Sequence, residues 1–536
     1  MAEAAVTTRS APPPYGIIYN WDGAPHGYST APQSLDEFLQ FTYAPLIDTQ
    51  VGALFWCVGE HAARWSSTAL EQLGDVHGRH YESAAAYHHT ENIRRMVERG
   101  EDPHAALIER GHELGLAVYA SLRVNDNHFD GAQIGDLPDL HHTELTSLRQ
   151  QHPEWLLGER TSDWFALSWD LSVPEVRRYR LDHLREICER YDWDGVELDW
   201  QRHPFHLPED EAYRLRFALT DLQRAARRLA DDIASQRGRP FYLAVRVAGT
   251  LESCARIGYD VPTWVEEGLC DIVIPAGAAA TDPSLDIAAF VDLCRPRGIA
   301  VYGGFDGGLP GPWVGPEEHG VKERLRTRAI ASRYWEAGAD GVYVFNWHAD
   351  SHTRREMLTQ LGSAESLRAT DRVYAATHRF LVYEGAWRGA YRPDRQLGQV
   401  PVPLRETLTD CGPGAELTVA DDFTRDLPRR LELRLRLHEW VDGDEVVVRW
   451  DGEELAAGTV SVDLTGDSTG VSRISGDVWL RFPLAPTRVG RGTHRVETVL
   501  RRRHPQLVCD LMLTDVELAV AYSETYAATL LPEKSP

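Results

Sequence analysis

Short apolar segments and helical segments alternate along the first 350 residues, and this alternation restricts the fold most strongly. Between the apolar segments we predict helices such as 103–115, 174–191 and 322–339, and in the last two the apolar residues recur three and four positions apart, which is typical of helices. A doubly wound sheet is the alternative, but it needs no eighth strand, and the sequence contains neither a GxGxxG nor a P-loop motif. We therefore predict an α/β fold with a (β/α)8 TIM barrel. Its predicted strands are 16–23, 53–60, 116–126, 195–200, 241–249, 270–277, 299–308 and 341–350.

Two of the predicted helices carry recognisable end signals. Pro174 lies just inside the start of the helix 174–191, and Ser172 is available as its N-cap. Gly115 follows the helix that precedes the third strand, which is where a glycine commonly ends a helix.

The sequence pattern changes from about residue 370 onward. Apolar and polar residues alternate with period two in LELRLRLHEW, DEVVVRWDGEEL and GDVWLRFPL, and turn sequences such as WVDGDE separate these segments. This pattern predicts an all-β sandwich, and a length of 536 residues also favours two domains. We predict a disordered N-terminus at 1–14, the barrel at 15–368 and a C-terminal β-sandwich at 369–530.

Composition restricts the partners and the location. The net charge of −25, from 81 acidic and 56 basic residues, argues against nucleic acid or an anionic membrane as a partner and favours a neutral or cationic ligand. The opening MAEAAVTTRSAPPP does not resemble a signal peptide, and no apolar run reaches membrane-spanning length. The seven cysteines are scattered without a CxxC motif, so we expect reduced thiols rather than disulfides or a zinc site. We expect a cytoplasmic protein without a cofactor, and a homo-oligomer stays open.

Two carboxylates on the fourth predicted strand are the strongest functional signal. In YDWDGVELDW (191–200), Glu197 and Asp199 point to the same face with Cα atoms roughly 6–7 Å apart, whereas Val196 and Leu198 face the other way. Such carboxylates repel each other and resist desolvation, so a fold has little reason to accept them without a task. Chemistry, metal binding and a buried salt bridge are the three candidate tasks.

The C-terminal ends of the barrel strands are where the reactive groups of such proteins lie. The predicted ends combine carboxylates, arginines, amides and tryptophans, which suits sugars because their flat faces stack on Trp while their hydroxyls bond to polar side chains. Glycoside hydrolysis needs two carboxyl groups, about 5–5.5 Å apart for retention and 6.5–9.5 Å apart for inversion. We predict Glu197, Asp199 and Asp306 as catalytic residues. The predicted substrate-binding residues are Trp21, Asp22, Glu60, Arg123, Asn125, Asp126, His128, Gln201, Arg202, Arg246, Trp347 and His348.

The segment WDLSVPEVRRYRLDHLREICERYDWDGVELDWQRHP (169–204) resembles the corresponding part of the family-10-like glycosyl hydrolases. In those barrel proteins a helix that begins at PEVR leads into YDxDGIxxD, and Asp194, Gly195 and Asp199 fall on the recurrent positions. The resemblance implies carbohydrate hydrolysis. DGVELDW also resembles the DGxDxDxE strand of family 18 chitinases, in which the last carboxylate is the proton donor. This chain has Gln201 at that position and Glu197 at the first paired one.

Many of these residues also have a structural explanation. Asp194 is expected to bond loop amides at the strand entry, and Glu197 and Asp199 would form buried ion pairs with Arg123, Arg202 or Arg246. Asp306 would form an Asx turn between glycines. The remaining structural alternatives are hydrogen-bonding roles for His128, His203 and His348, and barrel-core roles for Trp21, Trp200 and Trp347.

Three functions remain open at this point. We favour a glycoside hydrolase that cleaves a small oligosaccharide or glycoside, with Glu197 as general acid/base and Asp199 or Asp306 as nucleophile or electrostatic partner. The second is a metal-dependent barrel hydrolase or isomerase with Glu197, Asp199, Asp126 and a histidine as ligands, although no HxH follows the first strand. The third is a non-catalytic carbohydrate-binding barrel, which Gln201 favours.

Overall fold

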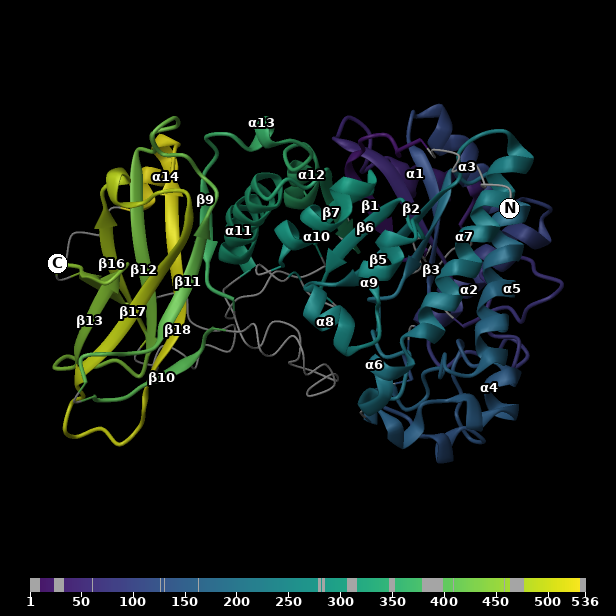
Figure 1. The fold of residues 1–536 in the computed structure, drawn as a ribbon, viewed down its shortest axis with the longest axis horizontal. Coiled ribbons are helices and arrows are strands. Elements are labelled where there is room, and N and C mark those ends of the chain that lie inside the picture. The colour runs from purple at the N-terminus through teal and green to yellow at the C-terminus, as the bar shows by residue number, and fades with distance from the viewer. Residues whose placement is uncertain are drawn as a thin grey trace, which may run out of the picture.

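A closed barrel of eight parallel strands forms the N-terminal part of the chain in the computed structural model (Figure 1). Its strands are β1 (Gly16–Trp21), β2 (Val51–Gly59), β3 (Ala117–Arg123), β4 (Gly195–Asp199), β5 (Tyr242–Ala248), β6 (Ile272–Ala276), β7 (Ala300–Phe305) and β8 (Gly341–Phe345). All eight predicted strands and their order are confirmed. The structure describes residues 10–23, 33–59, 61–125, 127–129, 131–161, 163–277, 281, 285–305, 316–346, 352–377, 399–407, 409–456, 458–462 and 477–530.

Helices surround the barrel and cover the outward faces of its strands (Figure 1). They are α1 (Leu35–Tyr43), α2 (Ala84–Glu98), α3 (Pro103–Glu113), α4 (Ser147–Gln151), α5 (Pro174–Arg190), α6 (Ala212–Leu215), α7 (Phe217–Arg237), α8 (Leu251–Arg256), α9 (Val261–Glu266), α10 (Ile287–Cys294), α11 (Pro316–Glu336), α12 (His352–Leu358) and α13 (Ala364–Leu367). Among the described residues, no helix is both long enough and apolar enough to cross a membrane.

The predicted helix ends are confirmed at one position and wrong at the other. Gly115 follows α3 with φ +76°, a left-handed conformation that glycine adopts without steric cost. The N-cap of α5 is Val173, which offers no side-chain bond, and not Ser172. Ser172 lies one residue too early, and its backbone N–H donates to Asp170 instead.

The C-terminal part contains two antiparallel sheets, consistent with the predicted β-sandwich. One sheet has the order β10-β18-β12-β16-β15, with β9 also paired to β18, and the other has the order β11-β17-β13-β14. The predicted limits of the two domains stay predictions. The strands are β9 (Arg372–Ala375), β10 (Val402–Leu404), β11 (Gly414–Val419), β12 (Arg430–His438), β13 (Glu445–Trp450), β14 (Glu453–Glu454), β15 (Thr459–Val462), β16 (Val478–Leu484), β17 (Gly492–Arg502) and β18 (Leu511–Ala521), followed by helix α14 (Glu524–Thr529).

Period-two burial explains why these segments form sheets. Leu431, Leu433, Leu435 and Leu437 of β12 point into one apolar core, while the residues between them are charged. In the barrel, the same alternation places one set of side chains against the helices and the other set inside the barrel. The interior set determines where functional groups converge.

The cysteines agree with the expectation of reduced thiols. All seven carry free thiols, five of them buried and two, Cys411 and Cys509, exposed.

Candidate active site

Glu197 and Asp199 lie side by side in the barrel interior, as the strand alternation predicted. Both side chains are fully buried, whereas Val196 and Leu198 pack into the core between the strands and the helices. Glu197 is paired in register with Ser121 of β3, and Asp199 with Arg123 of the same strand. The two carboxyl groups have different hydrogen-bonding and charged partners, and these make their properties differ.

Neutral hydrogen-bond donors hold one oxygen of Glu197. The Ser121 hydroxyl donates to Oε2 at 2.5 Å, and the Asn20 amide donates to Oε2 at 3.0 Å and to the Ser121 oxygen at 3.1 Å. The other oxygen, Oε1, is buried and has no hydrogen-bond partner among the described residues. Because Oε2 already accepts two bonds, a proton on this carboxyl group belongs on Oε1.

The environment of Glu197 favours its protonated form. Burial is the main cause, the nearby charge of Asp199 adds to it, and together they raise the pKa of Glu197 to about 8. The Ser121 hydrogen bond, the nearby Tyr343 hydroxyl and the charge of Arg246 act in the opposite direction but do not offset this rise. Glu197 is therefore a carboxylic acid that can hold a proton at neutral pH.

Asp199 has a charged partner instead. Nη1 of Arg246 lies 3.1 Å from both carboxylate oxygens of Asp199, and both side chains are fully buried. The backbone N–H groups of Gln201 and Arg202 also donate to Oδ1, at 3.0 and 2.9 Å. The predicted ion-pair explanation therefore holds for Asp199 with Arg246. It also means that Asp199 shapes the turn that follows β4.

Three guanidinium groups surround the ring of Phe345, the last residue of β8. Those of Arg246, Arg123 and Arg202 lie 4.3, 5.1 and 5.7 Å from its ring centroid, within cation–π range. Arg123 also forms an ion pair with Asp22, which lies just beyond β1. The C-terminal end of the barrel therefore combines an aromatic face with alternating charges.

Other predicted binding residues have structural contacts. The Asn125 side chain bonds the backbone of Trp169 twice and that of Phe205 once, which fixes the loops after β3 and β4. His128 bonds the Glu144 carboxylate at 2.9 Å, and Arg202 reaches His128 at 3.3 Å. Gln201 is fully buried.

Trp21, Trp200 and His203 belong to the packing. Trp21 stacks on Tyr19 and meets Phe41 edge-on, so it lies on the helix-facing side of β1 and not in the barrel interior. Trp200 is fully buried beside Tyr259 and Trp264. His203 accepts a bond from the backbone N–H of Asn127 at 2.5 Å. These positions do not favour sugar stacking on Trp21 or Trp200.

The structural role expected for Asp194 is confirmed. Its carboxylate accepts from the backbone N–H of Val118 at 2.8 Å, bonds His112 at 2.8 Å and pairs with Arg239 at 3.1 Å. These contacts tie the entry of β4 to β3 and to the end of α3.

Some of the predicted site residues lie outside the described residues, and some of the residues around Glu197 were not predicted. Five predicted residues lie outside the described residues: Glu60, Asp126, Asp306, Trp347 and His348. Conversely, the sequence-based site lacks Asn20, Ser121 and Tyr343, which surround Glu197. Strand parity was the available signal for Ser121, because it lies two residues before the predicted Arg123 on β3.

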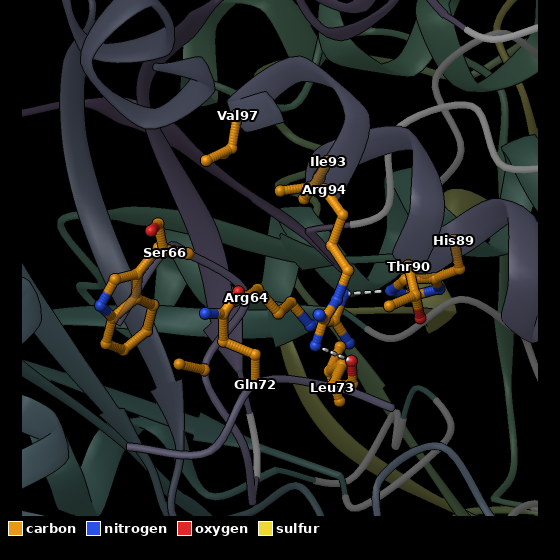
Figure 2. A pocket seen from close by; sticks show the side chains of 11 residues that line it. Arg64, Ser66, Gln72, Leu73, His89, Thr90, Ile93, Arg94 and Val97 are labelled. Atoms are coloured by element: carbon orange, nitrogen blue, oxygen red, sulfur yellow. Dashed lines mark hydrogen bonds between the residues drawn. The ribbon is translucent and has the colours of Figure 1, made fainter. Parts of the chain in front are cut away.

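The described residues contain no group of three histidine, cysteine, aspartate or glutamate side chains that could hold a metal ion. A separate small cavity lies near the ends of β1 and β2, beside α2, and Figure 2 shows His89 and Thr90 on the side opposite Ser66. Arg64 lies in it and donates to the backbone oxygen of Asp22 at 3.0 Å and bonds His89. Neither Glu197 nor Asp199 lines this cavity.

Comparison with protein families gives a partial match. Residues 73–219 match the model described as glycosyl hydrolase-like 10. The resemblance predicted from residues 169–204 is therefore confirmed, and the matched region runs from before α2 into α7. The match supports a carbohydrate-active barrel. A search of curated protein sequences found no match.

Solved structures of glycoside hydrolases show distant likenesses. The family 36 α-galactosidase AgaA from Geobacillus stearothermophilus is 12% identical, with 94% of this chain and 55% of that chain covered and a TM-score of 0.33. The glycoside hydrolase domain of PelA from Pseudomonas aeruginosa is 14% identical (46% and 84% covered, TM-score 0.28). A family 18 N-acetylglucosaminidase from Paenibacillus barengoltzii is 12% identical (49% and 87% covered, TM-score 0.30). This chain spans 55% of the length of the α-galactosidases, and likenesses this distant do not bear on its substrate.

Proposed function

We propose that this protein is a glycoside hydrolase in which Glu197 supplies the proton to the leaving group. The observation that carries the proposal is the state of its carboxyl group: one oxygen is held by Asn20 and Ser121, and the other is buried, unbonded and suited to carry a proton. The match to the glycosyl hydrolase-like 10 model over residues 73–219 supports the same chemistry.

The raised pKa of Glu197 suits general acid catalysis. An acid with a pKa near the working pH is protonated before the reaction and can still release its proton, and this type of catalysis contributes about 10²–10⁴-fold. Once the proton has left, Asn20 and Ser121 continue to donate to Oε2 and stabilise the carboxylate. Since Glu197 is fully buried, the proton reaches a scissile oxygen through one ordered water or through local opening of the barrel mouth.

The other carboxylates of the barrel mouth take different parts in this proposal. Asp199 and Asp22 are paired with Arg246 and Arg123, so they position the guanidinium groups that bond sugar hydroxyls. Asp199 also acts electrostatically, since its charge helps to keep the proton on Glu197. Asp306 stays the proposed nucleophile or electrostatic partner, and it lies outside the described residues. The proposed substrate is a small neutral or cationic glycoside in the cytoplasm, with neither nucleic acid nor membrane as partner.

The experiment is a hydrolysis screen on aryl glycosides and short oligosaccharides with the wild type and Glu197→Gln. Gln keeps the acceptor for Asn20 and Ser121 but cannot donate the proton, so we expect kcat to fall about a hundredfold or more. Glu432→Gln is the matched control, because Glu432 is a buried carboxylate bonded to Arg481 at 2.8 Å in the β12 sheet, far along the chain from the site. Equal activity of Glu197→Gln and the wild type would exclude Glu197 as the acid.

A non-catalytic sugar-binding barrel is the second candidate. Asp199 is engaged on both oxygens by Arg246, and buried Gln201 occupies the position of the chitinase proton donor. This candidate replaces the first if no glycoside is hydrolysed by the wild type while one of the oligosaccharides raises its melting temperature.

A further inference from the structure

Two polar atoms without hydrogen-bond partners belong to side chains that act on each other in the barrel interior. One is Oε1 of Glu197, and the other is the hydroxyl oxygen of Tyr343 on β8; both are buried and neither has a hydrogen bond among the described residues. A buried polar group that lacks a partner is costly, so two such groups near each other call for an explanation.

Tyr343 is held in the interior by its neighbours. It is fully buried in the cluster that fills the barrel, and its ring meets Phe55 of β2 edge-on at 6.1 Å. The guanidinium of Arg246 lies 6.0 Å from its ring centroid, and that same group binds Asp199. Two residues further along β8, Phe345 contacts the arginines of the barrel mouth. The Tyr343 side chain is therefore fixed in the layer that holds the carboxyl pair.

We propose that Tyr343 is a positioning residue that stabilises the ionised form of Glu197 by donating a hydrogen bond to Oε1 once the proton has left. This inference rests on the proposed function and extends it to a named group. When Glu197 is protonated, Oε1 carries the proton and needs no donor. After proton transfer Oε1 becomes an acceptor, and the Tyr343 hydroxyl has no competing acceptor among the described residues.

The electrostatic surroundings agree with this role. Burial first, and then the charge of Glu197, raise the pKa of Tyr343 well above its usual range, so the phenol keeps its proton and can donate it in a hydrogen bond. The charged and titratable groups that act on Glu197 are Asp199 on β4, Arg246 on β5 and Tyr343 on β8, and the donors Asn20 and Ser121 are neutral. Of these three titratable groups, Tyr343 is the neutral one, so it can donate a hydrogen bond to Glu197 without adding a charge to the site.

The test is an infrared titration of the Glu197 carboxyl group in the full chain, with Glu197→Gln used to assign its band. Without the donor, the carboxylate is less stable, so Tyr343→Phe is expected to raise the midpoint by about one pH unit. Tyr119→Phe is the matched control, because it removes a buried hydroxyl that bonds Tyr15 at 2.7 Å and not the carboxyl pair. An unchanged midpoint in folded Tyr343→Phe would overturn the proposal.

A second measurement covers the case in which Tyr343→Phe does not fold. With tyrosine labelled at its phenolic carbon, one NMR signal of the wild type is expected to shift with a midpoint near the pKa of Glu197 of about 8 and to stop shifting in Glu197→Gln. A set of tyrosine signals that behaves identically in the two proteins would reject the contact. Neither readout needs turnover, so failure of the hydrolase proposal and failure of this inference are separate results. If glycosides are hydrolysed, kcat of Tyr343→Phe is expected to fall about tenfold.

Discussion

Glu197 and Asp199 show how neighbours two residues apart on one strand acquire opposite properties. Both are fully buried and face the barrel interior, yet Asp199 has the guanidinium of Arg246 while Glu197 has only the neutral donors Asn20 and Ser121. Arginine stabilises the charge of Asp199, and that charge in turn disfavours a second charge on Glu197. Pairs whose environments differ in this way divide acid and base roles between them.

The raised pKa of Glu197 predicts how stability varies with pH. An unfolded chain would bind this proton only below about 4.5, whereas the folded chain binds it up to about 8. The folded state thus holds the extra proton between these values, and its contribution to stability is complete below about 4.5 and is lost as pH rises to about 8. Relative to Glu197→Gln, the wild type should lose up to about 1.4 kcal/mol of unfolding free energy per pH unit in that range. Urea unfolding at several pH values measures this, and parallel pH profiles of the two proteins would contradict it.

Strand β4 depends on a glycine at its entry. Gly195 lies opposite Tyr119 of β3 and Tyr242 of β5 in register. A Cβ atom at this position would lie 2.4 Å from a ring carbon of Tyr119 and 2.4 Å from the backbone oxygen of Tyr242. Asp194, just before it, bonds the backbone of Val118. The DG pair that begins the strand therefore sets its register and, through it, the position of Glu197.

Gly195→Ala should weaken the barrel by overpacking. The Tyr242 oxygen belongs to the sheet backbone and cannot move aside without disturbing β5, so we expect a loss of about 1–3 kcal/mol in the free energy of unfolding. Gly135→Ala is the control, because a Cβ there meets no atom within 4 Å and the backbone is not left-handed. Denaturant midpoints of both variants decide the question, and equal midpoints would show that the barrel relaxes around the added methyl group.

At the scale of the whole molecule, the C-terminal sheets are fastened to the barrel through α11. Leu325 of this helix packs with Val373 of β9 and Ala519 of β18, and Ala329 packs with the core of the sheets. Between these apolar contacts, Arg326 of α11 pairs with Glu517 of β18, which also binds Arg434 of β12 at 2.9 Å. Figure 1 shows α11 lying beside β9. The barrel and the sheets thus share one buried ionic cluster.

Removing Glu517 should therefore be costly to the whole chain. Glu517→Ala leaves buried Arg326 and half-buried Arg434 without their shared carboxylate, and breaking a buried pair on one side typically costs about 3–5 kcal/mol. Glu453→Ala, which removes a largely exposed partner of Arg488, should change the melting temperature far less. Calorimetry of both variants provides the comparison. A melting temperature of Glu517→Ala equal to that of Glu453→Ala would mean that the ionic cluster does not hold the two parts together.

Local pattern was enough to predict the eight barrel strands, because strands buried on both faces are short apolar runs between helical segments. The later sheets and the shared orientation of Glu197 and Asp199 were predicted from the period-two alternation of side chains along a strand. The same rule places Trp21 opposite to Asn20, on the helix-facing side of β1, so that part of the predicted site could have been corrected from parity alone. Ser172 was misplaced because helix ends are determined by backbone geometry rather than by residue type alone.

The sequence alone did not predict which residues contact the carboxyl pair. Glu197 meets residues 177 and 76 positions earlier in the chain, and Asp199 meets Arg246 47 positions later. No spacing rule relates residues so far apart, because barrel closure and strand register bring them together. By itself the sequence determined which residues form strands and which face each side chain takes, since these follow from local periodicity. Only the tertiary structure decided that Arg246 pairs with Asp199 and that Glu197 is left with neutral donors, because the pKa of a buried group depends on charges that folding brings within a few ångströms.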